Sequence, residues 1–234
     1  MLKVDDDFLK RICNNLISYD KEIVEIVQFE SSAYAPQYSK GFDLLVVTKK
    51  IKDYKGYLNA INSEDIKLNV IALEVGQKPK EELLKSILGS FNILYGDGRY
   101  LLEWIKTIKG LTFEEAKSSL KVASLLINLA SETSNPLDKD LLIREAFESI
   151  FYASRIALLT FLSTEINMLG SVEKDSLELY RAKFNDFVEV LHVKYYCNGD
   201  YPKERVVEEF NLWINSVEKY VNELEFKIKE IADS

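Results

Sequence analysis

The stretch "IVQFESSAYAPQYSKGFDLLVVTKK", residues 26–50, joins two apolar strand-like runs through a loop of small residues that contains a proline. The second run opens with a single carboxylate, Asp43, and the loop holds Glu30 followed by Ser31 and Ser32. A tight Gly-Ser turn after a strand can hold a triphosphate on its backbone N–H groups, and carboxylates opening the next strand can bind Mg²⁺. The stretch therefore has the layout of a phosphate and metal site, although its turn holds Glu30 and its second strand opens with only one carboxylate, Asp43.

Strands and helices alternate around this stretch, up to about residue 108. β-branched apolar runs predict strands, and apolar residues at helical spacing predict helices. We expect strands at residues 22–30, 42–49, 66–74 and near 91–95, helices at 6–18, 78–90 and after the Gly-Asp-Gly turn, and a short helix or loop at 53–65. This alternation predicts an α/β domain with a small mixed sheet at residues 1–108.

No strand pattern appears beyond Gly110. Thr112 is followed three residues later by Glu115, which is the spacing of a helix capping box, and a long apolar-periodic run comes after it. Further helices are expected at residues 138–166, 174–192 and 202–231. Four helices with short connections predict an antiparallel bundle at residues 111–234, so the whole chain is expected to be α+β.

Composition restricts the classes of function. The 234 residues are 47% hydrophobic and 29% charged, which is typical of a soluble globular protein, and the abundance of Lys, Glu, Ile and Tyr is compatible with a thermophile. The net charge of −8 provides no overall attraction to nucleic acid or membranes. Cys13 and Cys197 are far apart, and no apolar run reaches the ~20 residues of a membrane span. We therefore expect a cytoplasmic protein with no membrane partner and with neither a disulfide framework nor a zinc site.

The order of elements in the first half resembles the minimal nucleotidyltransferase family. The resemblance rests on "FESSAYA", "KGFDLLVV", "IKLNVIAL" and the later "FNILYGDG". Members of that family carry Gly-Ser after an apolar strand, Asp-x-Asp at the start of the next strand and an acid on the third. The resemblance implies that Ser31, Ser32, Asp43 and Asn69 occupy a nucleotide site, with Asp43 as a weak metal ligand and Mg²⁺ and a nucleoside triphosphate as cofactors if the cleft works.

Three polar positions depart from the family pattern. Glu30 stands at the glycine position, Gly41 at the first Asp and Asn69 at the third acid. Glu30 brings a side chain and a negative charge close to the expected triphosphate, which is unfavourable. Gly41 and Asn69 leave Asp43 as one carboxylate of an expected three, so we expect conventional two-metal chemistry to fail.

Other interpretations of these residues stay open. Asp65, which precedes the third strand, is one candidate to replace the missing acid. Glu74, at the end of that strand, is a poor replacement, because it lies an odd number of residues from Asn69 and so faces the other side of the sheet. Asp43 also suits a strand-edge carboxylate that caps a turn or pairs with Lys40. Ser31 and Ser32 equally suit ordinary turn residues that hydrogen-bond nearby backbone.

The helical half resembles the higher-eukaryote and prokaryote nucleotide-binding (HEPN) bundle. The resemblance rests on "REAFESIFYASRIALLTFL" and "FVEVLHVKYYCNGDYPKERVVEEFNLWINSVEKYV". Ribonucleases of that family carry Arg, four intervening residues and His, but Phe187 stands at that distance before His192, the single histidine of the chain. No RNA cleavage is therefore expected, and His192 is interpreted as a packed or hydrogen-bonded helix residue.

Aromatic and basic residues surround the same turn. At helical spacing the aromatic series is more typical of a core than of a base-stacking surface, and the basic residues suit either phosphate binding or a solvated rim. The aromatic residues are Tyr195, Tyr196, Tyr201, Phe210, Trp213 and Tyr220, and the basic residues are Lys194, Lys203 and Arg205.

These observations lead to one functional prediction and its alternatives. We expect a degenerate nucleotidyltransferase-like domain fused to a HEPN-like bundle, acting as a nucleotide-binding or regulatory and interaction module. The alternative is an active Mg²⁺-dependent enzyme that transfers NMP to a small molecule, protein or RNA; a toxin–antitoxin descendant on one chain is a third. A homodimer through the bundle is expected, because the helix at 138–166 has more apolar face than a bundle of this length needs.

Overall fold

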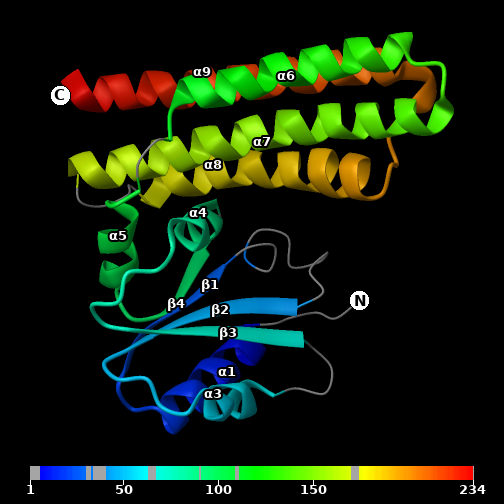
Figure 1. Cartoon of the computed structure of the whole chain (residues 1–234). Coiled ribbons are helices and arrows are strands. Elements are labelled where there is room, and N and C mark those ends of the chain that lie inside the picture. The colour runs from blue at the N-terminus through cyan, green and yellow to red at the C-terminus, as the bar shows by residue number, and fades with distance from the viewer. Residues whose placement is uncertain are drawn as a thin grey trace. The chain divides into compact units, whose positions relative to one another are not determined.

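The computed structural model describes residues 6–29, 33, 41–62, 67–89, 91–108, 111–169 and 174–233. The chain divides into two compact units, Met1–Ile108 and Lys109–Ser234, and each is described by itself (Figure 1). The first unit contains a four-stranded mixed sheet with helices and the second is helical. The predicted α+β class is confirmed.

The sheet of the first unit has the strand order β3-β2-β1-β4. β1 is antiparallel to both β2 and β4, whereas β2 and β3 are parallel. The two central strands are apolar along nearly their whole length because both of their faces are covered. The strands are β1 (Ile23–Phe29), β2 (Gly41–Thr48), β3 (Lys67–Glu74) and β4 (Phe91–Tyr95).

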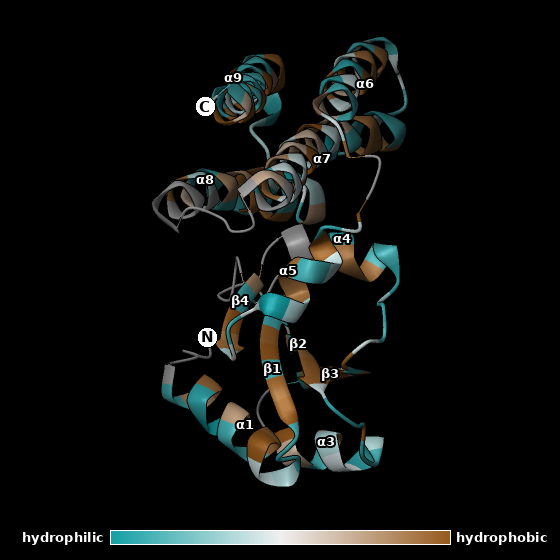
Figure 2. Ribbon diagram, turned by 90° about the vertical axis from the view of Figure 1, so that its left-hand side faces the viewer, coloured by the Kyte–Doolittle hydropathy of each residue, from teal (hydrophilic) through white to brown (hydrophobic). Residues whose placement is uncertain are grey.

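Helices cover both faces of this sheet (Figures 1 and 2). On one face lie α1 (Asp6–Tyr19) and α3 (Tyr54–Ile61), where the sequence allowed a short helix or a loop. On the other lie α4 (Glu81–Gly89) and α5 (Arg99–Ile105). The core under α1 and α3 is formed by Phe8, Ile12, Cys13, Leu16, Ile23, Ile26, Leu44, Val46, Tyr57, Ile61 and Val70. Alternation along the strands sends their other buried side chains to the opposite face.

The described residues of the second unit form four long helical segments. Successive segments run in opposite directions (Figure 1). The Thr112 hydroxyl accepts the Glu115 N–H at 3.2 Å, so the predicted cap of the first helix is present. Pro136 begins the next helix directly after Asn135, whose side chain accepts the Leu137 N–H at 3.0 Å. The segments are α6 (Phe113–Glu132), α7 (Pro136–Leu169), α8 (Lys174–Phe187) with the π-helix η1 (Val188–Cys197), and the 3₁₀ turn η2 (Lys203–Arg205) with α9 (Val206–Asp233).

The π-helix η1 differs from the sequence prediction, which placed one ordinary helix at residues 174–192. The α-helical hydrogen bonding ends at Phe187 and the π-helix continues to Cys197. Apolar residues at helical spacing predict that the chain is helical here, but they carry no information on whether N–H groups bond four or five residues back.

The apolar character of α7 is explained within the unit. Its Pro136–Glu165 part is long and apolar enough to span a membrane by length and composition, and 78% of its most apolar window is buried. Phe147, Phe151 and Phe161 are among its buried residues. The core helix of a soluble protein has these properties. Some apolar residues of α7 stay exposed, among them Leu137 and Leu141, so the expected dimer interface remains a prediction.

Candidate functional site

The candidate site lies where β2 and β3 begin. These strands are parallel, and Asp43 of β2 is the register partner of Asn69 of β3. The Asn69 amide nitrogen donates a hydrogen bond to an Asp43 carboxylate oxygen at 2.9 Å. Asp43 is half-buried and Asn69 is exposed, so both are accessible at the same edge of the sheet. The structure therefore brings together the two predicted site residues that it describes on these strands.

Gly41 has a structural reason to lack a side chain. A Cβ atom at this position would lie 2.6 Å from the carbonyl oxygen of Lys67, its register partner on β3. Real Cβ atoms essentially never approach backbone oxygen so closely, so any larger residue would push the two strands apart locally. An aspartate at Gly41 would thus require a shift of the backbone as well as a change of side chain.

Five other residues named from the sequence are outside the part of the chain that the structure describes: Glu30, Ser31, Ser32, Lys40 and Asp65.

Glu74 does not replace the missing acid. It ends β3, five residues beyond Asn69, and its carboxylate accepts the Ile51 N–H at 2.9 Å. Five residues of strand span about 16 Å, so Glu74 fixes a loop at the opposite end of the sheet.

Two buried carboxylates in the same unit were not recognised from the sequence. Asp20 lies between α1 and β1 and accepts hydrogen bonds from the hydroxyls of Tyr57 and Thr48 at 2.6 and 2.7 Å. Glu25 of β1 accepts the N–H groups of Leu101 and Tyr100 at the start of α5, at 3.1 and 3.4 Å. Burial raises the pKa of Glu25, and these N–H groups only partly offset the effect. Both acids hold elements of the fold together.

In the helical unit, most of the aromatic series forms part of the core. Tyr195, Tyr201, Phe210 and Tyr220 are buried, and Phe147 of α7 packs against the first three of them. Lys194, Lys203 and Arg205 are exposed. His192 is hydrogen-bonded to Glu148 and packs against Phe151. These contacts agree with the expectation that it is a packed, hydrogen-bonded helix residue.

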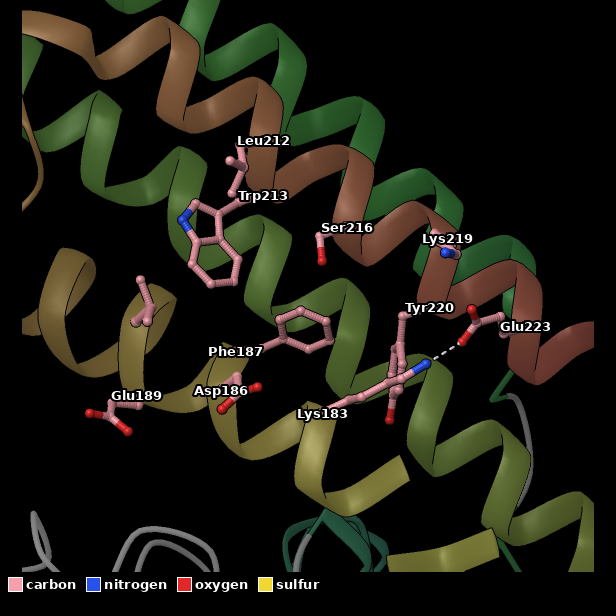
Figure 3. Close-up of a pocket in the computed structure, with 11 residues that line it drawn as sticks. Lys183, Asp186, Phe187, Glu189, Leu212, Trp213, Ser216, Lys219, Tyr220 and Glu223 are labelled. Carbon is pink, nitrogen blue, oxygen red and sulfur yellow. Dashed lines mark hydrogen bonds and ion pairs between the residues drawn. The ribbon is translucent and has the colours of Figure 1, made fainter. Parts of the chain in front are cut away.

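A groove with an aromatic wall lies between α9 and the segment formed by α8 and η1 (Figure 3). Its volume is about 620 Å³, and Phe187, Trp213 and Tyr220 supply the aromatic surface. Lys183 and Glu223 form an ion pair of 2.7 Å across its rim. Charges of both signs border the groove, so it offers a binding surface for an apolar group without selecting for an anion.

Among the described residues, no three His, Cys, Asp or Glu side chains form a cluster that could hold a metal ion. At the edge formed by β2 and β3, the oxygen donors given by Asp43 and Asn69 provide one formal negative charge. Mg²⁺ in phosphoryl-transfer sites is typically held by carboxylates and by the phosphates themselves. The described residues therefore do not supply the donor set of a two-metal centre.

Comparisons with known proteins add one finding. No family model matches the sequence, and no curated protein matches it. One similar solved structure is described as a tri-AMPylated Shewanella oneidensis HEPN toxin in complex with MNT antitoxin. The match covers 52% of this chain and 95% of that chain, with 10% identity and a TM-score of 0.32. A TM-score this low does not establish a shared fold.

Proposed function

We propose that residues 1–108 form a catalytically degenerate nucleotidyltransferase-like domain and residues 111–234 a HEPN-like bundle. The protein acts in the cytoplasm as a nucleotide-binding or regulatory module rather than as an enzyme. The hydrogen bond from the Asn69 amide to the Asp43 carboxylate is the observation that carries this proposal. This bond supports the proposal because it joins the two residues expected in the site and directs an amide N–H, rather than a metal ion, at one oxygen of the Asp43 carboxylate.

The chemistry of this pair argues against transfer of a nucleotidyl group. Two-metal catalysis requires carboxylates that neutralise the charge of the metal ions and fix their separation. At Asn69 a neutral amide stands where a second carboxylate would be needed, and its N–H group, which cannot bind a cation, faces Asp43. At Gly41 the close approach of the Lys67 carbonyl leaves no room for a third carboxylate. Among the described residues, this edge of the sheet therefore holds Asp43 as the one carboxylate of an expected three.

Calorimetric titration with ATP, GTP, CTP and UTP, each with and without Mg²⁺, tests the proposal. We expect any heat of nucleotide binding to be independent of Mg²⁺ and to persist in Asp43→Ala. Saturable heat that requires Mg²⁺ and disappears in Asp43→Ala would instead support an active nucleotidyltransferase.

Asn69→Asp is the matched variant, because it changes the amide to a carboxylate of the same shape. We expect this variant to gain Mg²⁺ affinity over the original protein, since two adjacent carboxylates favour a divalent cation between them. Asn92→Asp, on β4 of the same sheet, is the control for a general increase in negative charge.

A further inference from the structure

We propose that Cys197, His192 and Glu148 form a reactive thiol site in the helical unit, and that low-molecular-weight disulfides modify Cys197 there. The Cys197 sulfur lies 3.8 Å from Nε2 of His192, and Nδ1 of His192 lies 2.8 Å from a Glu148 carboxylate oxygen. Cys197 is exposed to solvent and forms no disulfide. The site is independent of the proposed nucleotide cleft, because all three residues belong to the second unit.

The two contacts of His192 give its ring nitrogens different roles. In a neutral imidazole, one nitrogen donates a hydrogen bond and the other accepts one. The Glu148 carboxylate only accepts, so it favours the tautomer that carries hydrogen on Nδ1. Nε2, which faces the Cys197 sulfur, is then the acceptor for the thiol proton. After proton transfer, the imidazolium lies between a thiolate and a carboxylate, which stabilise it from both sides.

The π-helix explains why His192 and Cys197 meet. The two residues are five positions apart on η1. An α-helix has 3.6 residues per turn, so residues five apart point in different directions. In a π-helix the backbone bonds join residues five apart, and side chains at that spacing share a face. The rare conformation of η1 therefore brings the thiol and the imidazole together.

Neighbouring groups hold the site in place. The His192 ring packs between Phe151, at a centroid distance of 4.9 Å, and Tyr196, at 5.8 Å. Arg144 of α7 donates to the carbonyl oxygens of Tyr196 and Cys197 at 2.6 and 2.9 Å, which places a cation beside the end of η1. A fixed imidazole and a nearby cation are typical surroundings of a reactive cysteine.

The turn after Cys197 favours modification over acyl transfer. Acyl transfer needs backbone N–H groups that can receive an oxyanion. The three N–H groups that follow the thiol are engaged in closing the helix end, since those of residues 198, 199 and 200 donate to the carbonyl oxygens of residues 193, 195 and 194. Thiol–disulfide exchange needs no oxyanion site, only a thiolate and an accessible disulfide.

The reaction balances with the disulfide as the oxidant. The thiol proton moves to Nε2 of His192, and the Cys197 thiolate attacks one sulfur of the small disulfide. A new bond forms to that sulfur while the original S–S bond breaks, and the leaving thiolate takes up the proton from His192. Cys197 ends as a mixed disulfide and one equivalent of the small thiol is released. Glu148 acts as a positioning residue through His192.

The rate of alkylation of Cys197 by iodoacetamide at pH 7 is the first test. The chain has two cysteines, and burial raises the pKa of the Cys13 thiol to about 11, so Cys13 serves as the internal reference. A free cysteine is only about 3% thiolate at pH 7, so ionisation of Cys197 raises the rate by up to about thirtyfold and the lower nucleophilicity of its thiolate removes about tenfold, which leaves a gain of about threefold. We expect Cys197 to react that much faster than a cysteine in an unstructured peptide, while Cys13 stays unlabelled.

Variants then assign the effect. His192→Asn should return the rate to that of the peptide, and Glu148→Gln should lower it less. The ultraviolet absorbance of the thiolate, measured against Cys197→Ser, should fall in both variants. Labelling of Cys13 would reveal an unfolded variant, in which case His192→Gln replaces His192→Asn. A Cys197 rate equal to the peptide rate, or one unchanged by loss of His192 in a folded protein, would overturn the proposal.

Bis(2-hydroxyethyl) disulfide is the probe for the modification itself. This neutral molecule avoids repulsion from Glu145 and Glu148, whose charges raise the pKa of the adjacent Tyr196. Mass spectrometry should show one mixed disulfide at Cys197, formed more slowly in His192→Asn. Fast alkylation without a mixed disulfide at Cys197 would contradict the proposed reaction.

Discussion

Tyr57 donates a hydrogen bond of 2.6 Å to the carboxylate of Asp20, which lies 37 residues earlier in the chain. Thr48 donates to the same oxygen at 2.7 Å, and the Glu22 N–H donates to the other oxygen at 3.0 Å. Asp20 is fully buried and joins the end of α1 to β2 and α3. Burial acts to raise the pKa of Asp20, but the hydrogen bonds from these groups outweigh it and hold that pKa below its usual value.

Tyr57→Phe should destabilise the first unit, because it removes one donor to a buried charge while keeping the ring. We expect a loss of about 2 kcal/mol in the free energy of unfolding, typical of a hydrogen bond to an ionised group. Urea unfolding can be followed by Trp104 fluorescence in a Trp213→Phe background, so that the signal comes from this unit. Tyr95→Phe, at an exposed position of β4, should change stability by less than about 0.5 kcal/mol.

The stability that depends on Asp20 should disappear in acid. A carboxylate with a lowered folded-state pKa stabilises the fold above its unfolded-state pKa, near 3.9, and loses that contribution as the pH falls through the folded-state value. Asp20→Asn should therefore cost about 2 kcal/mol at pH 7, and the difference from the original protein should shrink below about pH 4. A difference that stays constant from pH 7 to pH 3 would show that the charge of Asp20 is not involved.

Glu25→Gln should behave in the opposite way. The pKa of Glu25 is raised, so its protonated form favours the folded state at low pH and this advantage is lost as the pH rises through the folded-state pKa. A neutral glutamine resembles the protonated acid and keeps one acceptor for the N–H groups of α5. We expect a change of less than about 1 kcal/mol at pH 7, since removing a buried charge offsets the lost hydrogen bond. A loss as large as that of Asp20→Asn, measured by the same fluorescence assay, would contradict this.

Arg144→Ala should loosen the end of the π-helix. The Arg144 guanidinium donates hydrogen bonds to the last carbonyl oxygens of η1, at Tyr196 and Cys197, where the helix ends. We expect a loss of about 2 kcal/mol in the second unit, followed by Trp213 fluorescence in a Trp104→Phe background. Arg205→Ala, at an exposed position of η2, is the matched control and should have little effect.

The sequence predicted the architecture well because that information lies in local patterns. The apolar runs of β1 and β2, the cap at Thr112 and the Gly-Asp-Gly turn each belong to one short segment. Asp43 and Asn69 could each be placed near the start of a predicted strand, and these two strands are parallel neighbours in the sheet.

Contacts between distant segments could not be predicted in the same way. Asp20 stands between Tyr19 and Lys21, a polar setting typical of an exposed turn, and only the fold brings Tyr57 and Thr48 over it. Glu148 and His192 are 44 residues apart, and their contact depends on how α7 packs against η1. The conformation of η1 depends on backbone bonding that side-chain periodicity does not encode.

An apolar stripe on α6 leads to the prediction of self-association. Val122, Leu125 and Leu129 recur at helical spacing and are all exposed, Leu125 at 69%. Val122 also lines a small cavity together with Tyr152 of α7, so the stripe continues onto the neighbouring helix. Contiguous exposed apolar side chains of this kind mark interaction surfaces more often than isolated ones.

If this stripe forms the homodimer interface, Leu125→Glu should convert a dimer to a monomer in light scattering coupled to size-exclusion chromatography, because each interface would bury two unpaired carboxylates. Phe226→Glu, which changes a similarly exposed apolar residue on α9, should leave the dimer intact. A monomeric original protein, or a dimer broken by Phe226→Glu and not by Leu125→Glu, would show that the α6 stripe is not the interface.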